Sequence, residues 1–228
     1  MNVQDRINEY WTGRAPSYDD YQQQPARLDA DRAAWGAIWA AALPAAPADV
    51  LDVGTGSGQV AHTIARLGHR VTGIDLAEGM LERARAHGGD ATFRSGDAVE
   101  PPFRPARFDA VVSRYVMWTL REPARAVANW IRLLRPGGTI AVVDSTWFPD
   151  GLDASGGDFS RWYDASVRAA LPLAAAPSIQ PTADVFTAAG LTDVRVTPLT
   201  TILELDRTFG VAPGHEVQMQ YLIRGAVR

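Results

Sequence analysis

The sequence predicts an α/β domain, and two features of the chain support that prediction. From about residue 50 onward, short runs of continuous apolar residues alternate with stretches that have a helical period. Continuous apolar strands separated by helices are typical of a parallel sheet covered on both faces. A length of 228 residues with 46% hydrophobic content is enough for one such domain with a modest cap.

Seven strands and three helices are expected in the alternating region. The strands are short apolar runs that end at glycine, proline or charged residues, and the helices repeat apolar residues every three or four positions. The strands are expected at 50–53, 71–74, 91–94, 108–112, 139–143, 194–196 and 217–223. The helices are expected at 59–67, 78–86 and 123–134, with a turn at 135–138. The sheet is therefore predicted to be seven-stranded and mostly parallel.

Two segments lie outside this alternation. Residues 1–45 are expected to form an N-terminal helical cap, because Trp35, Trp39 and Ala42 recur at helical spacing before a proline- and alanine-rich linker. Residues 46–228 would then form the main domain. Residues 145–185 are rich in aromatic residues, glycine and proline and are expected to form an inserted lid. Both segments are expected to cover a cleft in the domain.

Composition excludes several classes of function. A net charge of −4 argues against a protein that grips nucleic acid by charge, and the absence of cysteine excludes thiolate catalysis and cysteine-ligated metals. All 22 basic residues are arginine, which excludes Schiff-base chemistry and a P-loop lysine. The four histidines are scattered, so no metal site is expected. The longest apolar run, 33–43, is too short to span a bilayer, and we expect a soluble, cytoplasmic protein without a membrane partner.

A glycine-rich turn after the first strand is the strongest local motif. The run VLDVGTGSG ends at Gly58, and its spacing is G-x-G-x-G. The dinucleotide fingerprint G-x-G-x-x-G would instead need its third small residue at Gln59. Asp75 ends the second expected strand, where a carboxylate can accept hydrogen bonds from both hydroxyls of a ribose. The two features favour a nucleoside ligand without a pyrophosphate; the alternative for Asp75 is a cap on the next helix.

Five segments in order resemble a known family. They are VLDVGTGSG, GIDLAEGML, the GDA at Gly96–Ala98, FDAVVSRYVMWTL and LLRPGGTIAVVD. The set resembles class I S-adenosylmethionine-dependent methyltransferases, in the small-molecule branch similar to the ubiquinone and menaquinone methyltransferases. The resemblance runs from about 50 to 144, and YWTGRAPSYDDY resembles the first helix of that branch. It implies a Rossmann-like fold whose last strand is antiparallel.

The resemblance also implies a cofactor and a reaction. The cofactor would be S-adenosyl-L-methionine, the product S-adenosyl-L-homocysteine, and the acceptor a nitrogen or oxygen of a small aromatic or apolar metabolite. Bacterial secondary metabolism is the expected setting. The expected cofactor-binding residues are Tyr10, Arg14, Asp52, Gly54, Thr55, Gly56, Gly58, Asp75, Leu76, Met80, Asp97, Ala98, Ser113 and Arg114. Among them, Asp75 would bind the ribose, Asp97 the adenine amino group and Arg14 the carboxylate, with a solvated surface arginine as the alternative for Arg14.

Aromatic residues are expected to bind the acceptor. These residues are Trp11, Trp118, Trp147, Phe159, Trp162 and Tyr163. The alternative is a small satellite core beneath a long loop. The expected catalytic residues are Tyr18, Tyr115 and Asp144, with Asp158 and Glu204 as further carboxylates to test as bases. Tyr115 stands where members of the family often carry histidine, so histidine-based proton transfer is not expected at that position.

Other functions remain open at this stage. One is a domain that binds S-adenosylmethionine without transferring methyl, in a regulatory role or in a rearrangement. A nicotinamide oxidoreductase is disfavoured by the glycine spacing and by the lack of lysine. A nucleic-acid methyltransferase is disfavoured by the acidic balance and by SRYV, rather than an Asn/Asp-Pro-Pro-Tyr type tetrapeptide, after the fourth strand. The expected partner is a small-molecule acceptor, with no nucleic acid, and the protein is expected to be a monomer or homodimer.

Overall fold

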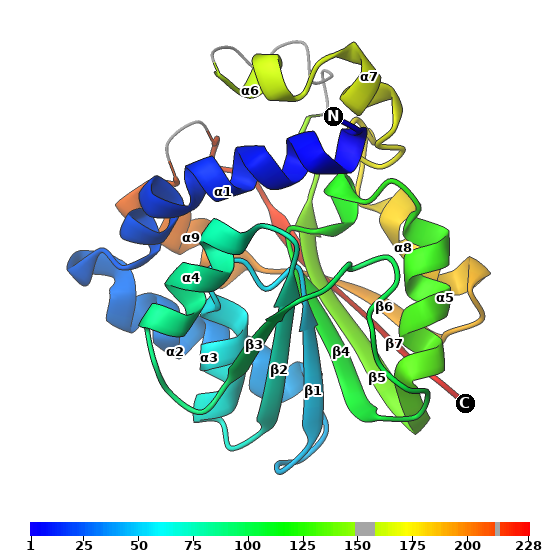
Figure 1. Cartoon of the computed structure of the whole chain (residues 1–228). Coiled ribbons are helices and arrows are strands. Elements are labelled where there is room, and N and C mark those ends of the chain that lie inside the picture. Colours follow the sequence, from blue (N-terminus) through cyan, green and yellow to red (C-terminus); the bar gives the residue numbers. More distant parts are fainter. Residues whose placement is uncertain (149–157, 213–214) are drawn as a thin grey trace.

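A seven-stranded sheet forms the centre of the molecule (Figure 1). The structure, a computed structural model, describes residues 1–148, 158–212 and 215–228. The strand order is β3-β2-β1-β4-β5-β7-β6; β7 runs antiparallel to β5 and β6, and the other neighbouring strands pair in parallel. The strands are β1 (Asp49–Val53), β2 (Arg70–Asp75), β3 (Thr92–Ser95), β4 (Phe108–Arg114), β5 (Leu134–Ser145), β6 (Thr192–Pro198) and β7 (Gln220–Ala226). The predicted fold class, with its antiparallel last strand, is confirmed.

Strands β5 and β7 differ most from the prediction. Residues 135–138 were expected as a turn, but β5 begins at Leu134 and includes them as an irregularity. Leu134 pairs with Phe108, and the next pair is Thr139 with Ala110, so the proline and glycines shift the register without ending the strand. The last strand begins three residues later than predicted, at Gln220, and Val217 remains 42% exposed.

Helices cover both faces of the sheet. The helices are α1 (Val3–Gln22), α2 (Pro25–Ala42), α3 (Gln59–Arg66), α4 (Glu78–Ala86), α5 (Pro123–Leu133), α6 (Asp158–Trp162), α7 (Ala165–Ala169), α8 (Gln180–Ala188) and α9 (Thr200–Phe209), with a 3-10 turn η1 (Met117–Thr119). The core on one face includes Trp130 of α5 and Phe186 of α8, and the core on the other includes Trp39 of α2 and Ile202 of α9. Sequence reasoning did not predict α9.

The N-terminal 45 residues divide into two different roles. Helix α2 packs against α3 and α9, and its Trp39 is fully buried in the same core as Val50 of β1. Helix α1 instead crosses the edge of the sheet where the parallel strands end (Figure 1). It contacts α4 on one side and α6 on the other. Only α1 therefore covers the carboxyl ends of the strands, whereas α2 is part of the main core.

Close contacts hold α1 in place. Asp19, which is 2% exposed, lies 2.8 Å from Nε2 of His87 at the end of α4. A capping box between Asn2 and Asp5 stabilises the first turn of α1. Gly79 of α4 lies so near α1 that a Cβ there would be 2.8 Å from the carbonyl oxygen of Thr12. The lack of a side chain at position 79 permits this approach.

We predict that Gly79→Ala loosens α1 and weakens nucleoside binding beneath it. The added Cβ would meet backbone atoms that have no flexible end to move, so α1 must shift away from α4. The affinity for S-adenosylhomocysteine, measured by calorimetric titration, should fall severalfold. The control is Gly13→Ala on α1 itself, where a Cβ meets nothing within 4 Å, and where alanine should stabilise the helix by about 0.5–1 kcal/mol. Equal behaviour of the two variants would contradict this account.

Candidate functional site

The glycine turn forms the floor of the site. After β1 the chain passes through Gly54 with φ of +63° and Gly56 with φ of +54°, a left-handed conformation that favours glycine. A Cβ at Gly54 would lie 2.4 Å from a methyl carbon of Val116. The backbone N–H of Thr55 donates to the carbonyl oxygen of Ile74 (2.9 Å), which fixes the turn against β2. The turn thus presents main-chain atoms to a ligand.

Asp75 stands beside this turn and does two things at once. Its Oδ2 accepts the N–H of Gly56 (2.9 Å), and its Oδ1 accepts the N–H of Ala77 (2.9 Å) at the start of α4. The helix-capping alternative is therefore part of its role. A carboxylate has about four acceptor positions, so both oxygens can still accept from hydroxyls in the cleft that Asp75 lines. Burial raises the pKa of Asp75 above its ordinary value.

A first cleft lies between the strand ends and α1. It measures about 960 Å³ when the open space at its mouth is included. Nine of the expected cofactor residues line it: Gly54, Thr55, Gly56, Asp75, Leu76, Met80, Asp97, Ala98 and Arg114. Asp97 accepts the N–H of Val99 at its Oδ1 (2.8 Å), which orients the carboxylate on the wall.

Helix α1 forms the cover of this cleft with residues that sequence reasoning missed. Its polar contributions are Gln4, Asn8 and Gln22, beside the aromatic Trp11 and Tyr18. Gln22 accepts the Ser57 hydroxyl at its Oε1 (3.1 Å) and thereby ties α1 to the glycine turn. The signal in the sequence is the spacing of three and four residues among these positions, which marks one face of a helix.

Five expected cofactor residues lie off the cleft wall. They are Tyr10, Arg14, Asp52, Gly58 and Ser113, none of which lines the cleft. Ser113 is fully buried, and Tyr10 packs in an aromatic cluster. Asp52 is 1% exposed and accepts the Thr55 hydroxyl at its Oδ2 (2.6 Å). Asp52 therefore supports the glycine turn from beneath.

Burial raises the pKa of Asp52 to about 7, which predicts a pH-dependent stability. Because the folded-state pKa lies above the unfolded value, the contribution of Asp52 is fully present below about pH 4 and is lost as pH rises to about 7. Asp52→Asn removes this loss and keeps an oxygen for the Thr55 hydroxyl. The free energy of unfolding of the variant, relative to the wild type, should rise between pH 4 and 7 in urea titrations. If the difference in unfolding free energy between the variant and the wild type does not change over this range, the pKa of Asp52 is not raised in the folded protein.

A second cleft opens from the first. It measures about 600 Å³ including its mouth, and it shares Tyr18, Gln22, Arg114 and Tyr115 with the first cleft. The rest of its wall is formed by residues of α1, α2, the segment after β5, α9 and the chain that leads from α9 to the first residue of β7. Those residues are Tyr21, Arg27, Asp31, Trp35, Trp147, Asp206, Val211, Ala212, His215, Glu216, Gln218 and Gln220. Of the expected acceptor residues, only Trp147 lines this cleft.

Tyr115 lies where the two clefts meet, and its backbone conformation is strained. Its φ is +63°, which is uncommon for a bulky side chain and is found at functional sites. Its N–H donates to the carbonyl oxygen of Val143 (2.8 Å), and its hydroxyl donates to Oε1 of Gln220. Burial raises the pKa values of Tyr115 and Tyr18 above their ordinary value. Both phenols therefore stay protonated, which suits hydrogen-bond donation and does not suit the role of a base.

A buried ion-pair network forms one side of the second cleft. Nε of Arg27 pairs with Asp31 (2.7 Å), and Nη2 pairs with Asp206 (2.6 Å). Nη1 of Arg27 donates to the carbonyl oxygen of Gly210 (2.7 Å). The other oxygen of Asp206 accepts from Nε2 of Gln220 (2.8 Å). This network joins α2, α9 and β7 into one rigid wall.

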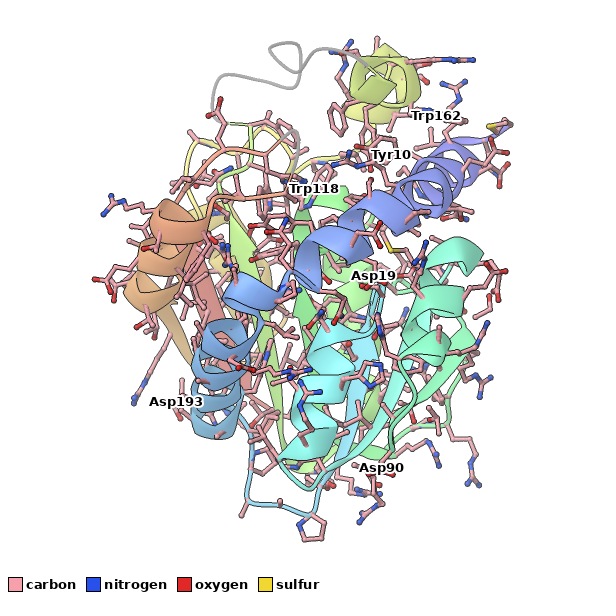
Figure 2. All side chains as sticks on the ribbon, turned by 90° about the vertical axis from the view of Figure 1, so that its left-hand side faces the viewer. Tyr10, Asp19, Asp90, Trp118, Trp162 and Asp193 are labelled. Atoms are coloured by element: carbon pink, nitrogen blue, oxygen red, sulfur yellow. The ribbon has the colours of Figure 1, made fainter. Side chains whose placement is uncertain are left out.

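The aromatic residues near the insertion form a satellite core. The ring of Tyr163 stacks on Phe159, with centroids 4.3 Å apart, and on Trp118 at 5.6 Å. Its hydroxyl accepts the indole N–H of Trp11 (3.1 Å). Figure 2 shows Tyr10, Trp118 and Trp162 gathered where α1 meets the helices that lie over it. Trp118, Phe159, Trp162 and Tyr163 pack in this cluster and line neither of the two clefts, which favours the satellite-core alternative; a role in binding the acceptor stays a prediction.

The carboxylates expected as bases are placed elsewhere. Asp144 is 1% exposed, lines neither cleft, and accepts the N–H of Ser145 (2.8 Å), that of Trp118 (3.3 Å) and the indole N–H of Trp147. Burial raises the pKa of Asp144 to about 6. It positions Trp147 and η1 and does not reach either cleft. Glu204 is exposed on α9, and the side chain of Asp158 lies outside the described residues.

His215 is a further functional candidate. It lines the second cleft, 6.4 Å from the ring of Tyr18 and 5.8 Å from that of Trp147. Burial lowers its pKa to about 4, so the imidazole is neutral near pH 7. Among the residues that the structure describes, no group of three or more His, Asp or Glu side chains is arranged to hold a metal ion. In the same part of the chain, the helices are too short or too polar to cross a membrane.

Comparison with known sequences agrees with this geometry. Residues 51–142 match the model of a methyltransferase domain. Over 156 residues the chain is 31% identical to a demethylmenaquinone methyltransferase of Renibacterium salmoninarum, covering 68% of this chain and 63% of that protein. Over 138 residues it is 32% identical to a ubiquinone biosynthesis O-methyltransferase of Xanthomonas oryzae pv. oryzae, covering 58% of this chain and 54% of that protein. The chain spans less than two thirds of the length of these relatives.

Solved structures share the fold at low identity. A SAM-dependent methyltransferase from Thermotoga maritima matches with a TM-score of 0.63 and 15% identity over 100% of both chains. The [4+2]-cyclase SpnF matches with a TM-score of 0.59 and 20% identity, over 84% of this chain and 79% of that one. The sheet order, glycine turn and acidic strand end define the class I, Rossmann-like methyltransferase fold. Together with the sequence matches, they show that residues 51–142 are similar in sequence and in fold to the central part of methyltransferase domains.

Proposed function

We propose that this protein transfers a methyl group from S-adenosylmethionine to an oxygen or nitrogen of a small, flat metabolite. The observation that carries the proposal is the pair of joined clefts. One is built around a glycine turn and a strand-end carboxylate, and the other has aromatic walls. Methyl transfer needs two ligands whose reacting atoms meet, and the clefts meet at Tyr18, Gln22, Arg114 and Tyr115.

The residues of the first cleft fit the cofactor. Gly56 leaves open space where a Cβ would stand, with the nearest atom, Sδ of Met80, at 3.9 Å. Asp75 retains acceptor positions for two ribose hydroxyls, and Asp97 presents a carboxylate to an exocyclic amino group. Leu76 and Met80 supply apolar surface for a base. When bound, the cofactor supplies an activated methyl group on a sulfonium, so the chain needs no covalent nucleophile.

The chain contributes position, exclusion of water and a proton acceptor. Helix α1 covers the first cleft, and the rings of Tyr18 and Tyr115 border the place where the clefts meet. As the acceptor oxygen or nitrogen bonds to the methyl carbon, the carbon–sulfur electron pair stays on sulfur and the acceptor loses its proton. His215 lies on the wall of the second cleft and is neutral near pH 7, so its imidazole has a free position for that proton, although its pKa of about 4 makes it a weak base.

The names of the relatives support an acceptor of the aromatic or quinol type. One relative is named for demethylmenaquinone and another for O-methylation in ubiquinone biosynthesis. A flat ring between aromatic walls is consistent with either chemistry. A biosynthetic role in bacterial secondary metabolism is a further part of the proposal and is supported by the use of arginine for all 22 basic residues. A cytoplasmic location is part of this proposal, as is a monomeric or homodimeric state.

Turnover analysis tests the proposal. The protein is incubated with S-adenosylmethionine and a panel of phenols, quinols and aromatic amines, and the products are quantified by mass spectrometry. The expected result is one equivalent of S-adenosylhomocysteine for each product heavier by one methylene group. Conversion of a compound to a product of the same mass, without formation of S-adenosylhomocysteine, would instead indicate a protein that does not transfer methyl. A [4+2]-cyclase shares this fold, so the fold alone does not decide between the two functions.

A further inference from the structure

Among the described residues that line the second cleft, Arg114 is a cation that forms no ion pair with a carboxylate. Arg114 lies at the end of β4 and lines both clefts. Its guanidinium carbon is 4.8 Å from the ring centroid of Trp35 and 5.1 Å from that of Tyr115. Within the described ranges, no Asp or Glu oxygen lies within ion-pair distance of Arg114. Stacking on two rings fixes the plane of the guanidinium and leaves its N–H edge for a ligand.

The other charged side chains on the wall of the second cleft belong to the Arg27 network or are exposed. Arg27 pairs with both Asp31 and Asp206, and Gln220 occupies the second oxygen of Asp206. Glu216 is exposed. Among the described residues, Arg114 is therefore the cation on this wall that forms no ion pair. A partly buried cation without a partner favours binding of an anion.

The shape and chemistry of the walls indicate a flat ligand. Trp147 meets Tyr115 edge to face at 4.9 Å and His215 at 5.8 Å. Trp35 extends the same apolar lining beneath the guanidinium of Arg114. Because Trp35 lines only the second cleft, the stacked guanidinium faces that side of the junction. Rings at these spacings bind a planar aromatic group more readily than a flexible chain.

We propose that the second cleft binds the methyl acceptor, and that the acceptor is a planar aromatic carboxylate whose carboxylate pairs with Arg114. This inference rests on the proposed function and adds the chemical class of the acceptor. A guanidinium and a carboxylate form two parallel hydrogen bonds, so the pair fixes the orientation of the ring as well as its affinity. The ring then lies against Trp35 or Trp147, beside the wall shared with the first cleft.

The test uses matched acids and amides. Hydroxybenzoates and aminobenzoates, each paired with its carboxamide, are titrated by calorimetry into protein saturated with S-adenosylhomocysteine. The wild type should bind the best acid at least about tenfold more tightly than its amide, since a charge-assisted pair contributes more than a neutral hydrogen bond. Arg114→Gln should reduce this ratio to within about twofold. Arg132→Gln, which removes an exposed positive charge on α5, should leave the ratio unchanged.

Three results would overturn the assignment. The first is a wild-type protein that binds amides as tightly as acids, or that binds neither at millimolar concentration. The second is an acid preference that persists in Arg114→Gln. The third is a large loss of S-adenosylhomocysteine affinity in Arg114→Gln with the acid preference intact, which would assign the residue to the cofactor. Because the titrations begin from the saturated complex, failure to bind S-adenosylhomocysteine would separately refute the proposed function.

Discussion

Asp75→Ala should lower the affinity for S-adenosylhomocysteine about a hundredfold. In the wild type, a carboxylate oriented by the N–H groups of Gly56 and Ala77 is available to two ribose hydroxyls. A hydrogen bond to a charged group contributes about 1.5–3 kcal/mol, so the loss of two such bonds corresponds to at least about two orders of magnitude in Kd. Calorimetric titration measures the change directly.

Asp75→Asn separates the ribose contacts from the structural role. The asparagine keeps one oxygen that can accept from the Gly56 or Ala77 N–H, so the turn should hold its shape. Its affinity for S-adenosylhomocysteine should lie between those of the alanine variant and the wild type. Thermal melting of both variants without ligand controls for unfolding. An alanine variant that binds within threefold of the wild type would show that Asp75 does not hold the ribose.

Arg27→Ala should lose about 3–5 kcal/mol of the free energy of unfolding. The side chain of Arg27 is 8% exposed and that of Asp206 is 5% exposed, so the substitution leaves the buried carboxylate of Asp206 without its ion-pair partner. Removal of one partner of a buried pair costs this much because the remaining charge is neither solvated nor paired. Urea unfolding at pH 7 measures the loss.

Two controls sharpen the Arg27 experiment. Arg32→Ala removes an exposed arginine from the same helix, whose pair with Asp29 spans 3.7 Å, and it should change stability by less than about 0.5 kcal/mol. Without Arg27, the pKa of Asp206 should rise further, so the destabilisation should be smaller at pH 5 than at pH 8. Equal losses in the two variants would show that the network has no special part in stability.

The sheet and the cofactor cleft were predictable because their signals are local. The glycine turn, the apolar strands and the carboxylate that ends β2 each depend on a few consecutive residues. Gly54 and Gly56 are required by positive φ angles, and Asp75 follows its strand directly. Such features can be recognised without knowledge of tertiary contacts. Nine of the residues expected to bind the cofactor therefore line the first cleft.

The second cleft was not predictable because its walls come from distant parts of the chain. Arg27, Arg114, Asp206 and Gln220 belong to four elements, α2, β4, α9 and β7, and no motif links them. Helix α9 itself was missed, and with it one partner of the buried network. Trp35 was read only as part of an apolar helix face, although it also stacks against Arg114. The spacing of residues along the sequence shows which side chains share a face of a helix, but it does not show that Arg114 packs against Trp35 on that face.

The aromatic insertion shows a different limit. A cluster of Trp, Tyr and Phe is expected both for a ligand pocket and for a packed core, since the same apolar surface serves both. The rings of Phe159 and Tyr163 stack on each other with their centroids 4.3 Å apart, and composition alone does not reveal this packing. The same holds for Asp144, whose carboxylate is occupied by nearby N–H donors.

The central claim is that the first cleft holds a nucleoside with a methionine-type tail, and one titration tests it most directly. S-adenosylhomocysteine and, separately, a nicotinamide dinucleotide are titrated into the wild-type protein in a calorimeter under the same conditions. The account predicts binding of S-adenosylhomocysteine in the micromolar range at one site per chain and no binding of the dinucleotide. Binding of the dinucleotide with no heat from S-adenosylhomocysteine would contradict it.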